Sequence, residues 1–218
     1  MRSAVKRSAA LSITALATSV GMLFSVPVTH ASTATFDEYL GCGLKHGLEC
    51  FHADDAKKWA ERVTAWKFAD EVSSDKANSF QHCAWMGALA TRFGAKDAYR
   101  IGGLHEVHGG GDTIEDKIMD HLNNYEGVKI GAEAKERNLD DQWGYVLEKC
   151  EAKARAKELF GKEGVKGRYQ ATFSSVTLLK NLRFSRSRMH MDENRRAKDF
   201  SVDLGVKYGS VDRRKNLC

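Results

Sequence analysis

Proline is almost absent from this sequence of 218 residues, and Pro27 is the single example. A proline-rich linker between domains is therefore excluded, and no internal repeat or low-complexity stretch marks a second domain. Long apolar runs are also scarce, since no segment after residue 31 has the ~18 consecutive apolar residues of a transmembrane helix. We expect one domain, with no transmembrane segment beyond the first 31 residues.

Net charge is small once the amino-terminal segment is set aside. Three basic residues within the first seven precede an apolar, small-residue run over 9–26, and a short segment with small residues ends at Ala31. This three-part pattern predicts a secretory signal peptide over 1–31, cleaved after Ala31. Cleavage removes three basic residues and no acidic one, so the formal net charge falls from +5 to +2. The sequence thus predicts a secreted protein, extracellular or periplasmic, and so weak a charge disfavours nucleic acid as a partner.

The positive charge that remains is concentrated in the last third of the chain, whereas 112–120 is acidic. Residues 189–218 are basic and have little apolar periodicity, which predicts a partly ordered tail after a helical domain over 32–188. A basic surface facing an anionic polymer and a merely solvated face both fit this composition. Of the two, we favour the solvated face.

The cysteines are odd in number, so at least one has no partner within a monomer. They are Cys42, Cys50, Cys83, Cys150 and Cys218. Export permits disulfides, and the short glycine-bearing loop between Cys42 and Cys50 predicts a bridge there, at a spacing that matches no common zinc site. Cys83, set among aromatics on a predicted helix, is expected to be a buried free thiol. Cys150 with Cys218 is then a weaker second pair.

Apolar residues recur at three- and four-residue steps through most of the chain, which predicts helices. Ser74 or the next residue begins one helix that Gly94 ends, and Asp112 with Glu115 has the spacing of a capping box. The helices are expected over 54–68, 75–93, 95–107, 113–138 and 140–160. Periodicity does not decide between a strand pair and a helix for 164–188. We expect a mainly α, single-domain helical bundle, with room for a small β hairpin in the carboxyl-terminal third.

The segment 78–131 contains most of the groups able to do chemistry. Asn78 and His82 fall on the apolar stripe of the predicted helix 75–93, together with Trp85. Polar residues are normally excluded from a buried face unless they are paired or used. A lone histidine there is usually a core residue whose hydrogen bonds are satisfied. Two polar groups one turn apart make a functional pair about as well supported as a structural role.

Two further helices supply acids, bases and amides. His105 and Glu106 lack the H-E-x-x-H spacing that places two imidazoles on one helical face. Asp120, Asn123 and Asn124 share a face of the next helix with two interior glycines. Each such glycine costs about 1 kcal/mol relative to alanine, so we expect another helix or a substrate close to that face. A solvated polar face is the alternative.

An ordered series of residues in this segment resembles an uncharacterised bacterial domain. The series is Asn78-x-x-x-His82-Cys83-x-Trp85, His105-Glu106 and Asp120-x-x-Asn123-Asn124-x-x-Gly127. That domain is found in secreted proteins and in carboxyl-terminal parts of wall-associated and polymorphic-toxin-type proteins, and its members usually carry a basic residue where this chain has Gln81. The resemblance implies a shared helical site and a secreted, antagonistic role, without implying a reaction.

The residue types then indicate the chemistry. The expected catalytic residues are His82, His105, Glu106 and Asp120, because burial and mutual interaction can tune their pKa values. The residues expected to bind or orient a substrate are Asn78, Trp85, Asn123 and Asn124. Glu106 or His105 would activate water, and His82 or Asp120 would orient it or serve as the acid.

The leading hypothesis is a hydrolase that acts outside the cell on an envelope component, a phosphoester or another polymer. A divalent metal held by histidine and carboxylates is open, because it would also activate water. A thiol mechanism through Cys83 stays open too, although adjacent helical residues point about 100° apart. The alternative is a secreted binding or interaction protein whose polar cluster is a structural hydrogen-bond network. An open cleft would favour the enzyme and a sealed cluster the structural role.

Overall fold

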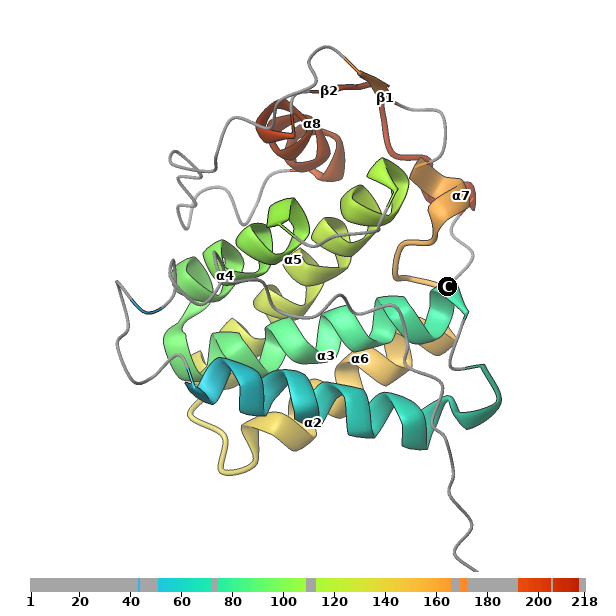
Figure 1. The fold of residues 1–218 in the computed structure, drawn as a ribbon. Coiled ribbons are helices and arrows are strands. Elements are labelled where there is room, and N and C mark those ends of the chain that lie inside the picture. Colours follow the sequence, from blue (N-terminus) through green and yellow to red (C-terminus); the bar gives the residue numbers. More distant parts are fainter. Residues whose placement is uncertain are drawn as a thin grey trace, which may run out of the picture.

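Helices α3 and α5 form the centre of the structure, a computed structural model that describes residues 43, 51–71, 74–108, 113–165, 169–171, 192–204 and 206–215 (Figure 1). The helices are α2 (Phe51–Lys67), α3 (Asp75–Phe93), α4 (Ala95–His108), α5 (Ile114–Glu136), α6 (Gln142–Arg155), α7 (Lys162–Val165) and α8 (Glu193–Asp203). Strands β1 (Tyr169–Ala171) and β2 (Val206–Tyr208) pair antiparallel. Single turns of tighter helix cover Ala69–Glu71 and Arg213–Lys215. The mainly α prediction is confirmed. No helix in the described residues is long and apolar enough to cross a membrane.

Local hydrogen bonds set the ends of the helices. Ser74 accepts a backbone N–H at 3.2 Å at the start of α3, and Gly94 ends that helix with φ 82°, in the left-handed region. Both ends are as predicted. The capping box of α5 is formed by Thr113 and Asp116, one residue later than predicted. Helix α6 ends at Arg155, before the predicted end at 160.

Two glycines of α5 allow α3 and α5 to approach closely. A Cβ on Gly127 would lie 2.1 Å from the Cys83 carbonyl oxygen, and one on Gly131 would lie 2.1 Å from the Gly87 carbonyl oxygen. Backbone atoms cannot move aside as a flexible side chain does, so neither position accepts a larger residue. Because Cys83 precedes Gly87 as Gly127 precedes Gly131, the two helices run in the same direction. The prediction that another helix lies close to these glycines is confirmed.

The main core lies between α3 and the helices around it. Phe80, Met86 and Leu89 of α3 are fully buried there, together with Tyr125 of α5 and Val146 of α6. Figure 1 shows α2 and α6 lying along α3, and both pack against it. Burying a side chain of this size contributes about 1.5–3 kcal/mol, so this core fixes the position of α3.

A disulfide between Cys83 and Cys150 joins α3 to α6 inside this core, with the two Cα atoms 5.8 Å apart. The predictions that Cys83 is a free thiol and that Cys150 pairs with Cys218 are therefore wrong. The physical reason is the helical rotation of about 100° per residue, which turns Cys83 away from His82 and towards α6. Because the thiolate is the reactive form of cysteine, the bridge also removes the thiol mechanism through Cys83.

A second core forms on a different face of α5, where α8 and β2 pack. Ile118 and Leu122 of α5 contribute to it with Phe200 of α8 and Tyr208 of β2, and all four are buried. Figure 1 shows α8 and the two strands together at one end of the molecule, next to α5. Helix α5 therefore belongs to both cores.

Residues 189–218, expected as a partly ordered basic tail, contain α8 and β2, and their buried side chains complete the second core. The β pairing is not a hairpin, because β1 precedes α8 and β2 follows it. Two predictions, the Cys42–Cys50 bridge and the signal peptide over 1–31, lie outside the described residues.

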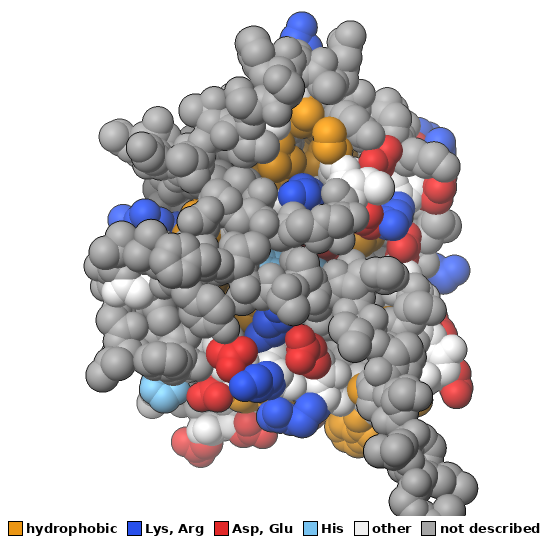
Figure 2. All heavy atoms as spheres, in the orientation of Figure 1, with side chains coloured by type: hydrophobic (Ala, Val, Ile, Leu, Met, Phe, Trp, Pro, Cys, Tyr) orange, Lys and Arg blue, Asp and Glu red, His pale blue; other side chains and the backbone are white. Residues whose placement is uncertain are grey.

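Charges of both signs are interspersed on the face of the molecule shown in Figure 2. Along α2 and the segment after it, Lys58 pairs with Asp54 at 2.6 Å and Lys76 pairs with Glu71 at 2.6 Å. Exposed pairs of this kind contribute about 0–1 kcal/mol each. Among the described residues of this face, the mixture of charges fits a solvated surface.

Candidate functional site

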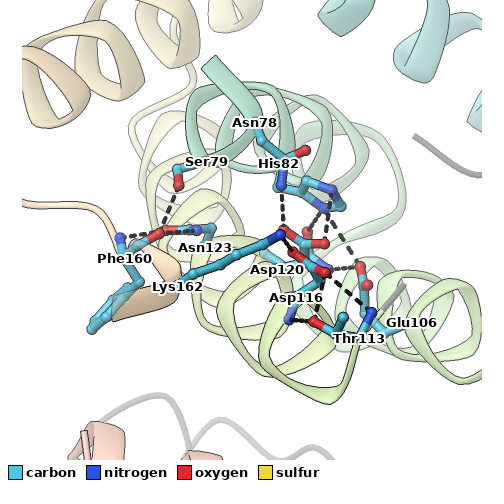
Figure 3. Close-up of polar contacts among 11 residues, drawn as sticks. Asn78, Ser79, His82, Glu106, Thr113, Asp116, Asp120, Asn123, Phe160 and Lys162 are labelled. Atoms are coloured by element: carbon cyan, nitrogen blue, oxygen red, sulfur yellow. Dashed lines mark hydrogen bonds and ion pairs between the residues drawn. The ribbon is translucent and has the colours of Figure 1, made fainter. Parts of the chain in front are cut away.

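Three helices bring His82, Glu106 and Asp120 together in the interior. His82 projects from α3, Glu106 from α4 and Asp120 from α5, and Figure 3 shows the imidazole facing both carboxylates. His82 Nδ1 lies 3.5 Å from Glu106 Oε1, and His82 Nε2 lies 3.5 Å from Asp120 Oδ2. Segments far apart in sequence thus form one cluster of an imidazole and two carboxylates.

Asn124 links His82 to Glu106. Its Nδ2 donates to Glu106 Oε1 at 2.7 Å, and its Oδ1 lies 2.9 Å from His82 Nδ1. Because the amide nitrogen of Asn124 donates to Glu106, its amide oxygen is left as the acceptor for the imidazole. His82 therefore carries its proton on Nδ1, and the lone pair of Nε2 faces Asp120.

Asn78 orients the second carboxylate. Its Nδ2 donates to Asp120 Oδ1 at 2.7 Å, while Oδ2 of the same carboxylate lies towards His82 Nε2. Asn78 and His82 are one turn apart on α3, as Asp120 and Asn124 are on α5. The parallel course of the two helices aligns these pairs. The helices approach closely at Gly127, one turn after Asn124 on α5, and this brings the short side chains within reach of one another.

All three members of the cluster are buried, with His82 and Asp120 each 4% exposed and Glu106 2% exposed. Burial, followed by the nearby His105, lowers the pKa of His82 from 6.5 to about 3, and the hydrogen bond with Asn124 opposes this only in part. The imidazole is therefore neutral at physiological pH. A neutral imidazole can act as a base or as a metal ligand.

His105 and Trp85 lie beside the cluster. The ring centroid of His105 is 6.3 Å from that of His82 and 4.9 Å from that of Trp85, which it meets edge to face. Trp85 is 6% exposed, and its indole Nε1 has no hydrogen-bond partner among the residues that the structure describes. A buried donor without an acceptor costs about 1–3 kcal/mol, so the indole N–H calls for an acceptor outside the described residues.

Asn123 lies outside the cluster, although the sequence grouped it with Asn124. Its Nδ2 donates to the Phe160 carbonyl oxygen at 2.9 Å, and its Oδ1 accepts from the Phe160 N–H at 2.8 Å. Ser79 Oγ donates to the same carbonyl at 2.6 Å (Figure 3). These bonds hold the chain beyond α6 against α3 and α5, so Asn123 has a structural contact where a substrate contact was expected.

The charged pair of Lys162 and Asp116 lies near the cluster and was not predicted. Lys162 Nζ is 2.6 Å from Asp116 Oδ1, one turn before Asp120 on α5. Burial raises the pKa of Asp116, but hydrogen bonds from Lys162 and Thr113 outweigh burial and hold that pKa below its usual value. The bond to Asp116 raises the pKa of Lys162, and the charges of Asp75 and Asp120 add to the effect. No periodic pattern marks Lys162, because it lies beyond the predicted end of a helix.

The cluster has the composition of a metal site and of an acid–base site. One ligand atom from each of His82, Glu106 and Asp120 lies within 4.8 Å of the other two, and the described residues contain no second group of this kind. Imidazole nitrogen and carboxylate oxygen are common ligands of divalent metals. The same groups accept protons from water. Either chemistry activates water for attack on a substrate.

Residues 40–158 match the family described as a domain of unknown function (DUF6973), and the chain belongs to that family. The matched region contains α2 to α6 and every residue of the cluster. Comparisons with curated proteins and with solved structures found no match. The resemblance to an uncharacterised domain is confirmed at that level, and the site must be interpreted from its own chemistry.

Proposed function

We propose that the protein is a secreted bacterial hydrolase that acts on an extracellular or envelope substrate such as a phosphoester. The observation that carries the proposal is the meeting of an imidazole and two carboxylates from three helices, each at most 4% exposed. Desolvating charged groups is unfavourable, and replacing them with well-packed apolar residues is often neutral or stabilising. A cluster of this kind is therefore better explained by use than by stability.

The contacts support a role for each member of the cluster. Glu106, held through Oε1 by Asn124, is the base that takes a proton from water. Asp120, held through Oδ1 by Asn78, and the lone pair of His82 Nε2 orient that water. The water oxygen attacks the substrate, and the proton on Glu106 passes to the leaving oxygen. Every proton taken from water is thus returned to a product.

Two further observations support the proposal. The buried indole N–H of Trp85, beside His82 and His105, suits a substrate oxygen as its acceptor. The disulfide between Cys83 and Cys150 is typical of proteins that fold in an oxidising compartment, which supports export. The three-part pattern over residues 1–31 supports the same location.

The second candidate is a secreted binding protein in which the cluster is structural. The low exposure of His82, Glu106 and Asp120 favours it, because a sealed network specifies packing without meeting a substrate. The two candidates predict different effects of replacing a carboxylate of the cluster. Loss of activity with the fold intact supports the hydrolase, whereas loss of stability alone supports the structural network.

The test is hydrolysis by residues 32–218 of phospholipid, nucleic acid and peptidoglycan. For the substrate that is cleaved, Glu106→Gln should lower kcat at least about 10²-fold, because it keeps the size of the side chain and removes the base. Glu126→Gln is the matched control, because Glu126 is a buried glutamate of α5 paired with Lys129 at 2.7 Å. Equal activity of both variants, or no cleavage by the unmodified protein, would contradict the proposal.

A further inference from the structure

We propose that His82, Glu106 and Asp120 bind one divalent transition-metal cation, with Zn²⁺ and Mn²⁺ as the best fits. The ligands are His82 Nε2, Asp120 Oδ2 and a carboxylate oxygen of Glu106. The inference rests on the proposed hydrolase for its purpose, because the cation would activate the water, but binding itself is tested without a substrate.

The proton of His82 lies on Nδ1, so Nε2 is the nitrogen that can bind a cation. Glu106 accepts the Asn124 amide N–H at 2.7 Å, so the amide oxygen is left to accept from His82 Nδ1 at 2.9 Å. Nε2 then presents a lone pair to Asp120 Oδ2, itself an acceptor, at 3.5 Å. An imidazole lone pair and a carboxylate oxygen are both atoms that bind divalent cations. A cation at this point gives both atoms a favourable contact.

The separation of the ligand atoms also suits a metal site. Bonds of ~2.1 Å to a tetrahedral cation place its ligand atoms ~3.4 Å from one another. Nε2 of His82 and Oδ2 of Asp120 are already 3.5 Å apart. One ligand atom from each of the three residues lies within 4.8 Å of the other two. The longest of these separations therefore exceeds the tetrahedral spacing by at most ~1.4 Å.

Two amide side chains hold the three ligands in position. Metal-binding histidines almost always donate their second ring N–H to an oxygen, which fixes the orientation of the ring, and metal-binding carboxylates are themselves hydrogen-bonded. Asn124 accepts the Nδ1–H of His82 and donates to Glu106, so it orients two ligands at once. Asn78 donates to Asp120 and so orients the third ligand. The cluster has the outer partners of a metal site as well as its ligands.

The ligand set limits the choice of cation. One imidazole nitrogen suits Zn²⁺, Mn²⁺ and Fe²⁺, whereas Ca²⁺ takes six to eight oxygen ligands. Three protein ligands leave a fourth position for water, which is the arrangement of catalytic zinc rather than of structural zinc. The two carboxylates also balance the charge of a divalent cation in a buried site, where an unbalanced charge is unfavourable.

Binding is measured by isothermal titration of chelator-treated protein, residues 32–218, with Zn²⁺ and Mn²⁺, and with Ca²⁺ for comparison. We expect one Zn²⁺ or Mn²⁺ per chain, a higher melting temperature on binding, and much weaker binding of Ca²⁺. Asp120→Asn should weaken the affinity at least about 10²-fold. Asn78→Ala, which removes an outer partner and no ligand, should weaken it about 10- to 100-fold.

Glu126→Gln is again the control, because it removes a buried carboxylate of α5 that pairs with Lys129 and Lys153. Its affinity should stay within about twofold of the unmodified protein. Circular dichroism of each variant establishes that the helices are retained, and Asn78→Ala keeps the test decisive if Asp120→Asn fails to fold. Equal affinities in Asn78→Ala, Asp120→Asn and Glu126→Gln would place any bound metal elsewhere and overturn the proposal, as would no binding by the unmodified protein.

The outcome for the metal is separable from the outcome for the hydrolase. Metal binding that depends on Asp120, without hydrolysis of any substrate, would support the metal site and contradict the hydrolase. Hydrolysis that depends on Glu106 but is unchanged by chelator, with no metal in the titration, would support the hydrolase as an acid–base enzyme and overturn the metal site.

Discussion

Two buried histidines, His82 on α3 and His121 on α5, look alike by burial and charge but have different surroundings. They are 4% and 1% exposed, and burial is the largest cause that lowers the pKa of each to about 3. His121 Nε2 is 2.6 Å from the Tyr99 hydroxyl, and its ring stacks on Phe200 with the centroids 3.8 Å apart. His82 instead faces two carboxylates.

The comparison shows that burial and a lowered pKa do not identify a functional histidine. Around His121, a hydroxyl and an aromatic ring stabilise the neutral imidazole within the second core, which is what a packing residue requires. Around His82, an amide fixes the proton on one nitrogen and a carboxylate lies opposite the other. The chemistry of the partners separates a packing residue from a candidate ligand or base.

On the His121 side, Phe200→Ala should have the largest effect. Phe200 is 1% exposed and belongs to the second core, so its truncation should lower the free energy of unfolding by about 3–5 kcal/mol. Urea unfolding measures this loss. Because the truncation removes volume from the second core and leaves the three predicted ligands in place, the metal affinity of the folded variant should stay within about twofold. Phe200→Leu, which keeps more of the volume, is the control and should lose less stability. A large loss of metal affinity in either variant would mean that the two regions are coupled through α5.

The corresponding change on the His82 side is Gly127→Ala. The added Cβ would lie 2.1 Å from the Cys83 carbonyl oxygen, so α3 and α5 must separate, at a cost of about 3 kcal/mol. Unlike Phe200→Ala, this variant should also weaken metal binding at least about tenfold, because His82 and Asp120 lie on the two helices that move apart.

Gly144→Ala is the control for Gly127→Ala. There the nearest atom to the added Cβ, at 2.1 Å, is a carboxylate oxygen of Asp141, a side chain that can rotate. It should cost less stability than Gly127→Ala and leave metal affinity unchanged. If both glycine variants bind metal equally well, the close helix approach does not position the ligands.

Helical spacing alone was enough to predict much of the cluster. Asn78 and His82 repeat at a step of four, as Asp120 and Asn124 do, and such residues share a face of a helix wherever that helix packs. The two glycines of α5 indicated a close neighbour because they are costly in a helix interior. Both signals depend only on the local geometry of the helix, which is the same whatever the helix packs against.

The sequence did not reveal direction around a helix or partners distant in sequence. Asn123 is next to Asn124, but the rotation between them directs it to the Phe160 backbone. Cys83 was expected to be free because it lies among aromatics on a helix, and no sequence signal names Cys150, 67 residues away, as its partner. Lys162 reaches Asp116 from the chain after α6. Periodicity identifies a face, but only tertiary packing decides what that face meets.

The stability of the protein should depend on pH through its two buried histidines, and His121 can be tested separately from His82. A histidine with a pKa near 6.5 when unfolded and about 3 when folded binds fewer protons in the folded state between those values. Stability from His121 is therefore complete above about pH 6.5 and is lost as the pH falls towards 3. Between pH 7 and pH 5 this loss amounts to about 2 kcal/mol. His121→Phe keeps a ring against Phe200 and cannot be protonated, so urea unfolding in chelator should show a loss smaller by about that amount. An identical loss in both proteins would mean that His121 is not held neutral by the fold, and its likeness to His82 would then end at burial.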